Sequence, residues 1–267
     1  MKKRKFLIAD KAKFDAQGRG LGRDEYYKPG LYTRDVPSKG QRQRVFLLRF
    51  KRLFEMMSHG ETLTLLQLDW NDDVIEIREQ YPLDPSLTVK IAKELNLLHP
   101  GYTSGGSIMT TDFLVTYKRK NNFSYQRAYQ IKHSQSDLDD GRTLAKLQIE
   151  ETYWKNKGIA WRVVLSANYN KVYCDNLELL QPFRNGIYSS NYLKLLHKYI
   201  QPIISKNSEL LYSNLSGFVE TSSENNFRIS FHECIKILLS KKILTFPIRN
   251  IRLQECKLGF FSEVGKC

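Results

Sequence analysis

Residues 108–165 constrain the fold most, because strand and helix patterns follow one another there with short connections. Residues 108–115 and 123–132 alternate with period two, as strands do, while residues 142–157 carry apolar side chains at helical spacing. Residues 159–165 are a short apolar run that is typical of a buried strand. A helix between two strands of one sheet predicts a crossover connection, so we expect an α/β unit around a central sheet.

The residues before this unit extend the same alternation. Ser58 and Glu61 have the spacing of a capping box and precede several leucines, which predicts the start of a helix. We expect a strand at residues 74–77, stopped by prolines, and a helix at residues 85–98. The predicted order is therefore helix, strand, helix, strand, strand, helix, strand. Residues 45–54 are apolar and basic and fit either a strand or a helix.

The apolar spacing changes after this unit. Residues 192–204 and 231–239 are helical in pattern, and the basic residues 241–248 are a short strand candidate. Helices followed by a basic β-wing suggest a winged-helix-like module, with a plain helical cap on the first domain as the alternative. We therefore expect an α/β domain with a basic arm at residues 1–168 and a mainly α, winged-helix-like domain at residues 169–267.

Charge divides the chain into three parts, with a formal net charge of +14. Residues 1–52 carry 16 Lys and Arg against 5 Asp and Glu, residues 53–169 carry 13 against 15, and residues 170–267 carry 13 against 8. An acidic middle between basic segments suits a carboxylate site that is flanked by surfaces for a polyanion.

The first 45 residues are rich in Lys, Arg and Gly, and we expect them to form an extended arm with short turns. Aromatic residues among these cations favour nucleic acid as the partner, and a merely solubilising tail is the alternative. The candidate DNA contacts, chosen because they cluster, are Arg19, Arg23, Arg42 and Arg44.

Other features narrow the class of protein. No run of about 18 apolar residues exists, which argues against a membrane span. The apolar run behind the basic start stops after four residues, so we do not expect a signal peptide. Cys174, Cys234, Cys256 and Cys267 lie far apart without a C-x-x-C pair, which indicates free thiols in a reducing cytosol and not zinc ligands. We expect a cytoplasmic protein.

Three polar side chains stand out on the two alternating strands. Asp112 lies on the first strand, and Gln130 and Lys132 share one face of the second, roughly 7 Å apart. If the strands pair, the three converge on one point, while Ile131 faces the core and its carbonyl can still reach a metal. A carboxylate and a second oxygen can hold a divalent cation beside a lysine that meets a phosphate, as metal-dependent phosphodiester hydrolysis requires.

The alternation also assigns the neighbours of Asp112. The even-numbered residues of 108–115 share the face of Asp112, and the odd-numbered ones, including Thr111 and Phe113, face the other side. The motif alone is weak, because an aspartate that opens a strand and a lysine that guards a sheet edge would look the same. Apolar neighbours on both strands favour a cleft over a solvated edge.

Longer stretches make the motif more specific. They are GRG at residues 18–20, VPS at 36–38, LDW at 68–70, DVIEIREQYPL at 73–83, MTTDFLV at 109–115, QIK at 130–132, and RTL through YW at 142–154. With these stretches in this order, the chain resembles the TnsA family, the endonuclease subunits of heteromeric, Tn-seven-like transposases. The resemblance covers roughly residues 18–165, and the C-terminal hundred residues match more weakly.

The resemblance implies a restriction-endonuclease-like N-terminal domain and a winged-helix-like C-terminal domain. It also implies a catalytic and metal-binding set of Glu61, Asp112, Gln130 and Lys132, with the carbonyl of Ile131 as a further metal ligand. Glu61 is the less direct match, because capping of a helix start explains the same residue. The implied cofactor is one or two Mg²⁺ ions, for which Mn²⁺ is expected to substitute.

The implied activity is cleavage of the non-transferred strand at the 5′ ends of a transposon in double-stranded DNA. A TnsB-like transposase would cut the 3′ ends, and a TnsC-like ATPase would bind the C-terminal domain and regulate the reaction. The element would then leave by cut-and-paste transposition in a prokaryotic cytosol, near the nucleoid. A stand-alone restriction- or resolvase-like nuclease and a non-catalytic DNA-binding adaptor are the alternatives.

Overall fold

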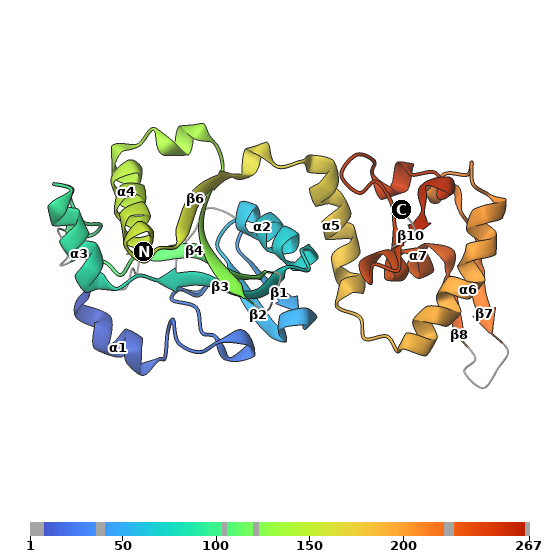
Figure 1. Cartoon of the computed structure of the whole chain (residues 1–267), viewed down its shortest axis with the longest axis horizontal. Helices are drawn as coiled ribbons and strands as arrows, with labels where there is room; N and C mark the ends of the chain where they lie inside the picture. The colour runs from blue at the N-terminus through green and yellow to red at the C-terminus, as the bar shows by residue number, and fades with distance from the viewer. Residues whose placement is uncertain (1–7, 36–40, 103–105, 120–122, 222–226, 265–267) are drawn as a thin grey trace. The chain divides into compact units, whose positions relative to one another are not determined.

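The computed structural model describes residues 8–35, 41–102, 106–119, 123–221 and 227–264. The chain divides into two compact units, Met1–Tyr169 and Asn170–Cys267, one residue beyond the boundary expected from the sequence. Figure 1 shows the elements of each unit along the chain, from blue at the N-terminus to red at the C-terminus. The VPS stretch at residues 36–38 lies outside the described residues.

A four-stranded mixed sheet forms the centre of the first unit. Its strands, in the order in which they pair, are β3 (Val74–Pro82), β4 (Thr110–Lys118), β5 (Ser124–Lys132) and β6 (Ala160–Leu165). Neighbouring strands are antiparallel except β5 and β6, which run parallel because α4 (Gly141–Asn156) carries the chain back between them. The predicted crossover and the predicted order of elements are confirmed.

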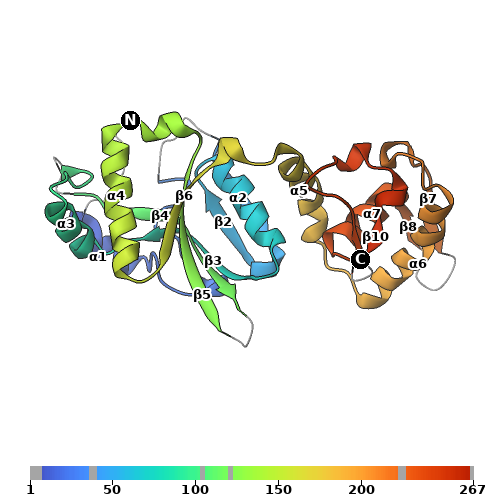
Figure 2. The same cartoon turned by 45° about the horizontal axis from the view of Figure 1, so that its top comes forward.

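Helices cover both faces of this sheet (Figure 2). On one face, Leu65 of α2 (His59–Trp70) packs with Phe113 and Ile131 of the sheet. On the other face, Trp154 of α4 packs with Leu114, together with residues of α3 (Pro85–Glu94). The core therefore has two apolar layers, which we call the α2 side and the α4 side.

A hairpin lies on the α2 side, where the sequence allowed either a strand or a helix. It consists of β1 (Gln43–Leu47) and β2 (Arg52–Met56), which pair antiparallel and are joined by η3 (Leu48–Phe50). Lys51 makes the turn possible with a left-handed backbone, φ 52°. Residues 45–54 thus contain two short strands, and the apolar run that spans them is split by a turn.

The N-terminal segment is folded, which corrects the expected extended arm. It contains η1 (Ile8–Asp10), α1 (Lys11–Ala16) and η2 (Asp24–Tyr26). Tyr27 is buried, and its hydroxyl donates to the backbone oxygen of Glu79 in β3 at 3.1 Å, 52 positions further along the chain. Sequence pattern does not reveal this layer, because the contacts that hold it on β3 join residues 52 positions apart.

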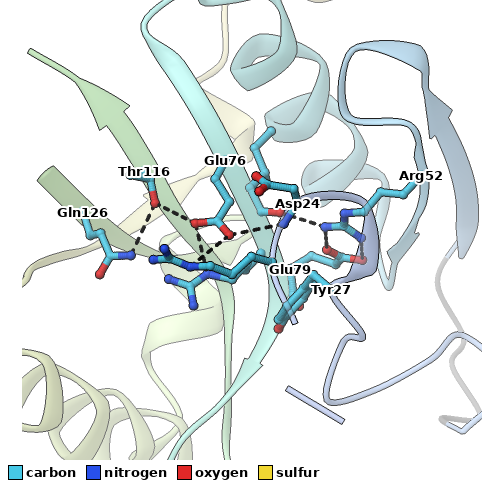
Figure 3. A network of polar contacts seen from close by, with 10 residues as sticks. Asp24, Tyr27, Arg52, Glu76, Glu79, Thr116 and Gln126 are labelled. Atoms are coloured by element: carbon cyan, nitrogen blue, oxygen red, sulfur yellow. Dashed lines mark hydrogen bonds and ion pairs between the residues drawn. The ribbon is translucent and has the colours of Figure 1, made fainter. Parts of the chain in front are cut away.

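Buried charges join this layer and β2 to β3 (Figure 3). Arg52 donates to both carboxylate oxygens of Glu79, and its guanidinium lies 5.3 Å from the centre of the Tyr27 ring. The Asp24 N–H and the Thr116 hydroxyl donate to the two oxygens of Glu76 at 3.4 and 3.1 Å. Breaking such a buried pair by removing one partner leaves a charge without compensation, so this network ties the N-terminal layer to the sheet.

The side chains of β3 switch from one face of the sheet to the other at Gln80, which has a left-handed backbone with φ 46°. In a regular strand Glu79 and Tyr81 would point to the same face. Instead Glu79 pairs with Arg52 on the α2 side, whereas the Tyr81 ring lies against Trp154 on the α4 side, with ring centroids 5.7 Å apart. The left-handed residue between them accommodates this inversion.

The side chains of β4 switch faces at the same level of the sheet. Glu79 pairs with Phe113 and Tyr81 with Thr111, so the residue opposite Gln80 is Asp112. Phe113 belongs to the α2 side, but the Thr111 hydroxyl donates to Glu150 of α4 at 2.6 Å. The expectation that Thr111 and Phe113 share a face is therefore wrong, because paired strands must invert together.

The second unit is mainly helical. Its helices are α5 (Lys171–Arg184), α6 (Ser190–Lys206) and α7 (Phe231–Ser240), and its strands are β7 (Phe218–Thr221), β8 (Phe227–Ser230), β9 (Leu244–Thr245) and β10 (Ser262–Glu263). Its short 3-10 turns are Tyr212–Asn214, Leu253–Glu255 and Leu258–Phe260, and two further turns of the first unit are Gln135–Leu138 and Ser166–Asn168. No helix in the described part of the chain is long and apolar enough to cross a membrane.

Helix α7 lies at the centre of the second unit, with Ile235 and Leu238 among its fully buried residues. The expected basic strand at residues 241–248 is reduced to β9, which pairs with β10, and its Leu244 faces the core. A hairpin of β7 and β8 precedes α7. The winged-helix assignment of this unit stays a prediction. Three cysteines of the described residues, at positions 174, 234 and 256, are buried free thiols.

Candidate active site

The residues of the predicted site line one cleft of about 580 Å³ in the first unit. Glu61 comes from the first turn of α2, Asp112 from β4, and Gln130, Ile131 and Lys132 from the end of β5. The pairing of β4 with β5 carries Asp112 to Gln130, because Phe113 pairs with Tyr129 and the strands are antiparallel. The structure thus brings all five predicted residues together.

Direct contacts connect these residues. The Ile131 N–H donates to Asp112 Oδ2 at 2.7 Å. Gln80 Nε2 lies between the two carboxylates, 3.2 Å from Glu61 Oε2 and 3.3 Å from Asp112 Oδ1. The carboxylates of Glu61 and Asp112 therefore share a neutral donor and face one point.

Glu61 serves the helix start and the cleft at once. Ser58 is the N-cap of α2, and its hydroxyl oxygen accepts from the Glu61 N–H at 3.2 Å. The Glu61 carboxylate accepts from the Met57 N–H at 2.9 Å and from the Ser58 hydroxyl at 3.0 Å. The capping explanation of Glu61 is therefore correct for its backbone, while its buried carboxylate also reaches Gln80 in the site.

Burial makes the negative charge of this cleft costly. It raises the pKa of Glu61 to about 8, and the neighbouring Asp112 carboxylate adds to the rise. Burial also raises the pKa of Asp112, although the Lys132 ammonium and the Ile131 N–H oppose the change. Two desolvated carboxylates with one lysine form a site in which a further cation would be stabilising.

The oxygen atoms of the cleft fit a hard divalent cation. Gln130 Oε1 is buried and has no hydrogen-bond partner among the described residues, which leaves a strong acceptor unsatisfied. Carboxylate, amide and carbonyl oxygens are the ligands that Mg²⁺ and Ca²⁺ prefer. Within the described ranges no three His, Cys, Asp or Glu side chains gather around one point, so the amide of Gln130 would stand where other sites have a third carboxylate.

Glu150 of α4 is a neighbour of the site that sequence reasoning missed. Its Oε1 accepts from the Thr111 hydroxyl at 2.6 Å and from the Trp161 indole at 2.9 Å. Burial raises its pKa to about 8. The negative charge of Asp112 adds to this rise, and the positive charge of Lys132 opposes it. The helical spacing of residues 142–157 placed Glu151, and not Glu150, on the buried stripe, whereas the structure buries Glu150 and exposes Glu151.

The four arginines proposed to contact DNA differ in accessibility. Arg19 is buried and forms an ion pair with Asp35, so its side chain is not accessible to DNA in this fold. The side chains of Arg23 and Arg44 are 73% and 60% exposed, although each approaches a glutamate. Arg42 donates to the Thr33 carbonyl and is also exposed. Clustering in the sequence could not separate an arginine of the core from those of the surface.

Comparison with known proteins gives the class of this chain. A family model described as "TnsA-like endonuclease N terminal" matches residues 71–166, which hold Asp112, Gln130 and Lys132 but not Glu61. The mixed α/β fold and this match define an endonuclease. "Transposon Tn7 transposition protein TnsA" of Escherichia coli is 34% identical over 249 residues, which are 93% of this chain and 89% of that protein. The chain belongs to the TnsA family, as its motifs predicted.

Proposed function

We propose that this TnsA-family protein is a divalent-metal-dependent DNA endonuclease that cleaves the non-transferred strand at the 5′ ends of a transposon. The observation that carries the proposal is the meeting of Glu61, Asp112, Gln130 and Lys132 in one cleft. Two carboxylates and an amide oxygen are oxygen donors for a metal, and the lysine supplies the positive charge that a phosphodiester needs.

The proposed ligands are Glu61, Asp112, Gln130 Oε1 and the backbone carbonyl of Ile131. Bound Mg²⁺, or Mn²⁺ in its place, would supply Lewis-acid activation of water and charge stabilisation at the attacked phosphate. Gln130 makes the donor set one negative charge smaller than a three-carboxylate site. We therefore expect modest metal affinity, which would keep the nuclease quiet until it is assembled on DNA.

Lys132 would act on the reacting groups. Its ammonium is close enough to Asp112 to oppose the rise that burial causes in the pKa of that carboxyl, and the side chain lines the same cleft. From there it would orient the attacking water or stabilise negative charge on the phosphate oxygens. Asp112 would be held in place by the Ile131 N–H, so its position would not depend on the metal.

The proposed partners follow from the family. They are double-stranded DNA at the transposon ends, a TnsB-like transposase for the 3′ ends and a TnsC-like ATPase that regulates both. The net charge of +14 supports a polyanionic partner. With both strands cut, the element would leave its donor by cut-and-paste transposition.

The test is an end-cleavage assay on transposon-end DNA with Mg²⁺, with and without the TnsB-like partner. We expect the wild type to cut 5′ ends only with the partner, and Asp112→Asn and Lys132→Ala to lose the cut while 3′ cleavage by the partner continues. Asp139→Asn, at an exposed carboxylate outside the cleft, is the matched control. Normal 5′ cleavage by Asp112→Asn would show that the site is wrong, and cleavage without the partner would identify a stand-alone nuclease.

A further inference from the structure

We propose that Gln80 is a positioning residue of the metal site, which gathers the carboxylates of Glu61 and Asp112 by donating a hydrogen bond to each. The inference rests on the proposed metal-dependent function. It adds a residue to the site that does not touch the reacting atoms and acts through the two carboxylates.

The amide of Gln80 is placed for this role. The residue is 3% exposed, and its Nε2 lies 3.2 Å from Glu61 Oε2 and 3.3 Å from Asp112 Oδ1. Its Oε1 accepts from the Thr110 hydroxyl at 3.2 Å. In the ionised form that binds a cation, both carboxylates accept only, so the NH₂ group must be the end that faces Glu61 and Asp112, and the Thr110 hydroxyl holds the amide in that orientation.

The backbone of Gln80 is held in an unfavourable conformation. Its φ of 46° lies in the left-handed region, which costs a residue with a Cβ atom roughly 1–2 kcal/mol. The Gly30 N–H donates to the Gln80 carbonyl at 2.9 Å, and a Cβ on Gly30 would lie 2.7 Å from that oxygen. The N-terminal layer therefore supports the residue, and only glycine fits at the point of support.

The inversion of facing explains why this position can reach both carboxylates. Gln80 stands opposite Asp112 in the sheet, at the level where β3 and β4 both change sides. In a regular strand its side chain would lie over one face of the sheet only. At the inversion it reaches Glu61, which belongs to a helix of the α2 side, while it keeps its contact with Asp112 of the neighbouring strand.

Without this donor, Glu61 and Asp112 would repel each other once both are ionised, and a binding cation would have to offset that repulsion by itself. Residues that hydrogen-bond to metal ligands typically contribute about 10–100-fold in metal affinity. A purely structural role for Gln80, in which only its left-handed backbone matters, makes a different prediction. Glycine in its place would then leave metal binding unchanged, since glycine adopts this conformation without strain.

The experiment measures Mn²⁺ binding to the full chain without DNA by titration calorimetry, together with thermal melting. We expect Gln80→Gly to remain folded, because relief of the backbone strain offsets part of the lost hydrogen bonding, and to bind Mn²⁺ about 10–100-fold more weakly. Binding as tight as the wild type, or tighter, overturns the proposal. If the glycine variant does not fold, Gln80→Asn replaces it, because asparagine tolerates positive φ but is one methylene shorter.

Asp112→Asn separates this proposal from the proposed function. If that variant also binds Mn²⁺ like the wild type, the metal site itself is wrong and the positioning role falls with it. If Asp112→Asn loses Mn²⁺ binding and Gln80→Gly keeps it, the metal site stands and only the role of Gln80 is refuted. Weaker binding by both variants supports both proposals.

Discussion

Glu150→Gln should make this protein more stable, although it replaces an ionisable group next to the candidate site. Glu150 is fully buried, and its Oε1 accepts hydrogen bonds from Thr111 and Trp161. The amide oxygen of glutamine can accept both bonds in the same place. The substitution therefore keeps the shape and the contacts and removes only the ability to ionise.

The magnitude follows from the pKa of Glu150, which burial raises from 4.5 to about 8. Folding then keeps a proton that the unfolded chain releases, so the free energy of unfolding falls as pH rises between these two values. The loss is about 1.4 kcal/mol for each pH unit, or about 3 kcal/mol at pH 7 relative to pH 4.5, and it levels off above pH 8. Glu150→Gln escapes this loss, so its advantage should grow from near zero at pH 4.5 to about 3 kcal/mol at pH 7.

Thermal and urea unfolding of the metal-free protein at pH 5, 6, 7 and 8 would measure this difference. At pH 7 the variant should melt roughly 6–12 °C above the wild type, from about 2–4 °C per kcal/mol for a unit of this size. Glu151→Gln, at the exposed neighbour on the same helix, is the control and should give no pH-dependent difference. A stability gap that stays constant from pH 5 to pH 8 would refute the reasoning, and so would a less stable Glu150→Gln at pH 7.

Three further predictions concern the site and the N-terminal layer. Mn²⁺ affinity should rise by up to about tenfold per pH unit as pH approaches 8 and level off above it. The reason is that Glu61, with a pKa of about 8, must lose its proton to bind a cation. A Mn²⁺ affinity that calorimetry finds unchanged from pH 6.5 to 8.5 would contradict this. Arg52→Met should lower the free energy of unfolding by about 3–5 kcal/mol in urea, since it leaves Glu79 buried without its counter-ion; a loss below about 1 kcal/mol would mean that the pair is replaceable. Arg19→Ala should lower the melting temperature without changing DNA affinity, whereas Arg23→Ala should weaken DNA binding and reduce its salt dependence without affecting melting. Filter binding at several salt concentrations measures this, and weaker DNA binding by Arg19→Ala with unchanged binding by Arg23→Ala would contradict it.

The central fold was predictable because its signals are local. Periods of 2 and 3.6 residues gave the order of elements, and the helix before β6 predicted the parallel pairing that α4 makes. The meeting of Asp112 with Gln130 and Lys132 followed from the pairing of two adjacent strands. Glu61 was harder, because its contribution to the helix start and its place in the cleft require the same residue type.

The parts that sequence reasoning missed depend on remote contacts. The groups in β3 that hold the N-terminal layer on the sheet lie 52 positions further along the chain, so no local pattern reveals these contacts. The inversion at Gln80 was hidden, because a left-handed backbone at glutamine has no sequence signature comparable to glycine. Glu150 was overlooked because the stripe expected for α4 passed through Glu151, which is exposed, so the predicted phase of the helix was off by one residue.

The two partners of the Arg52–Glu79 ion pair are synthesised in a fixed order. The donors to the Glu79 carboxylate are the guanidinium of Arg52 and the N–H of Glu55, and both precede it in the chain. During synthesis the β1–β2 hairpin leaves the ribosome first, and local hairpins form within microseconds, far faster than residues are added. When β3 emerges, its most deeply buried charge can meet a counter-ion that is already in place, before the rest of the central sheet has been translated.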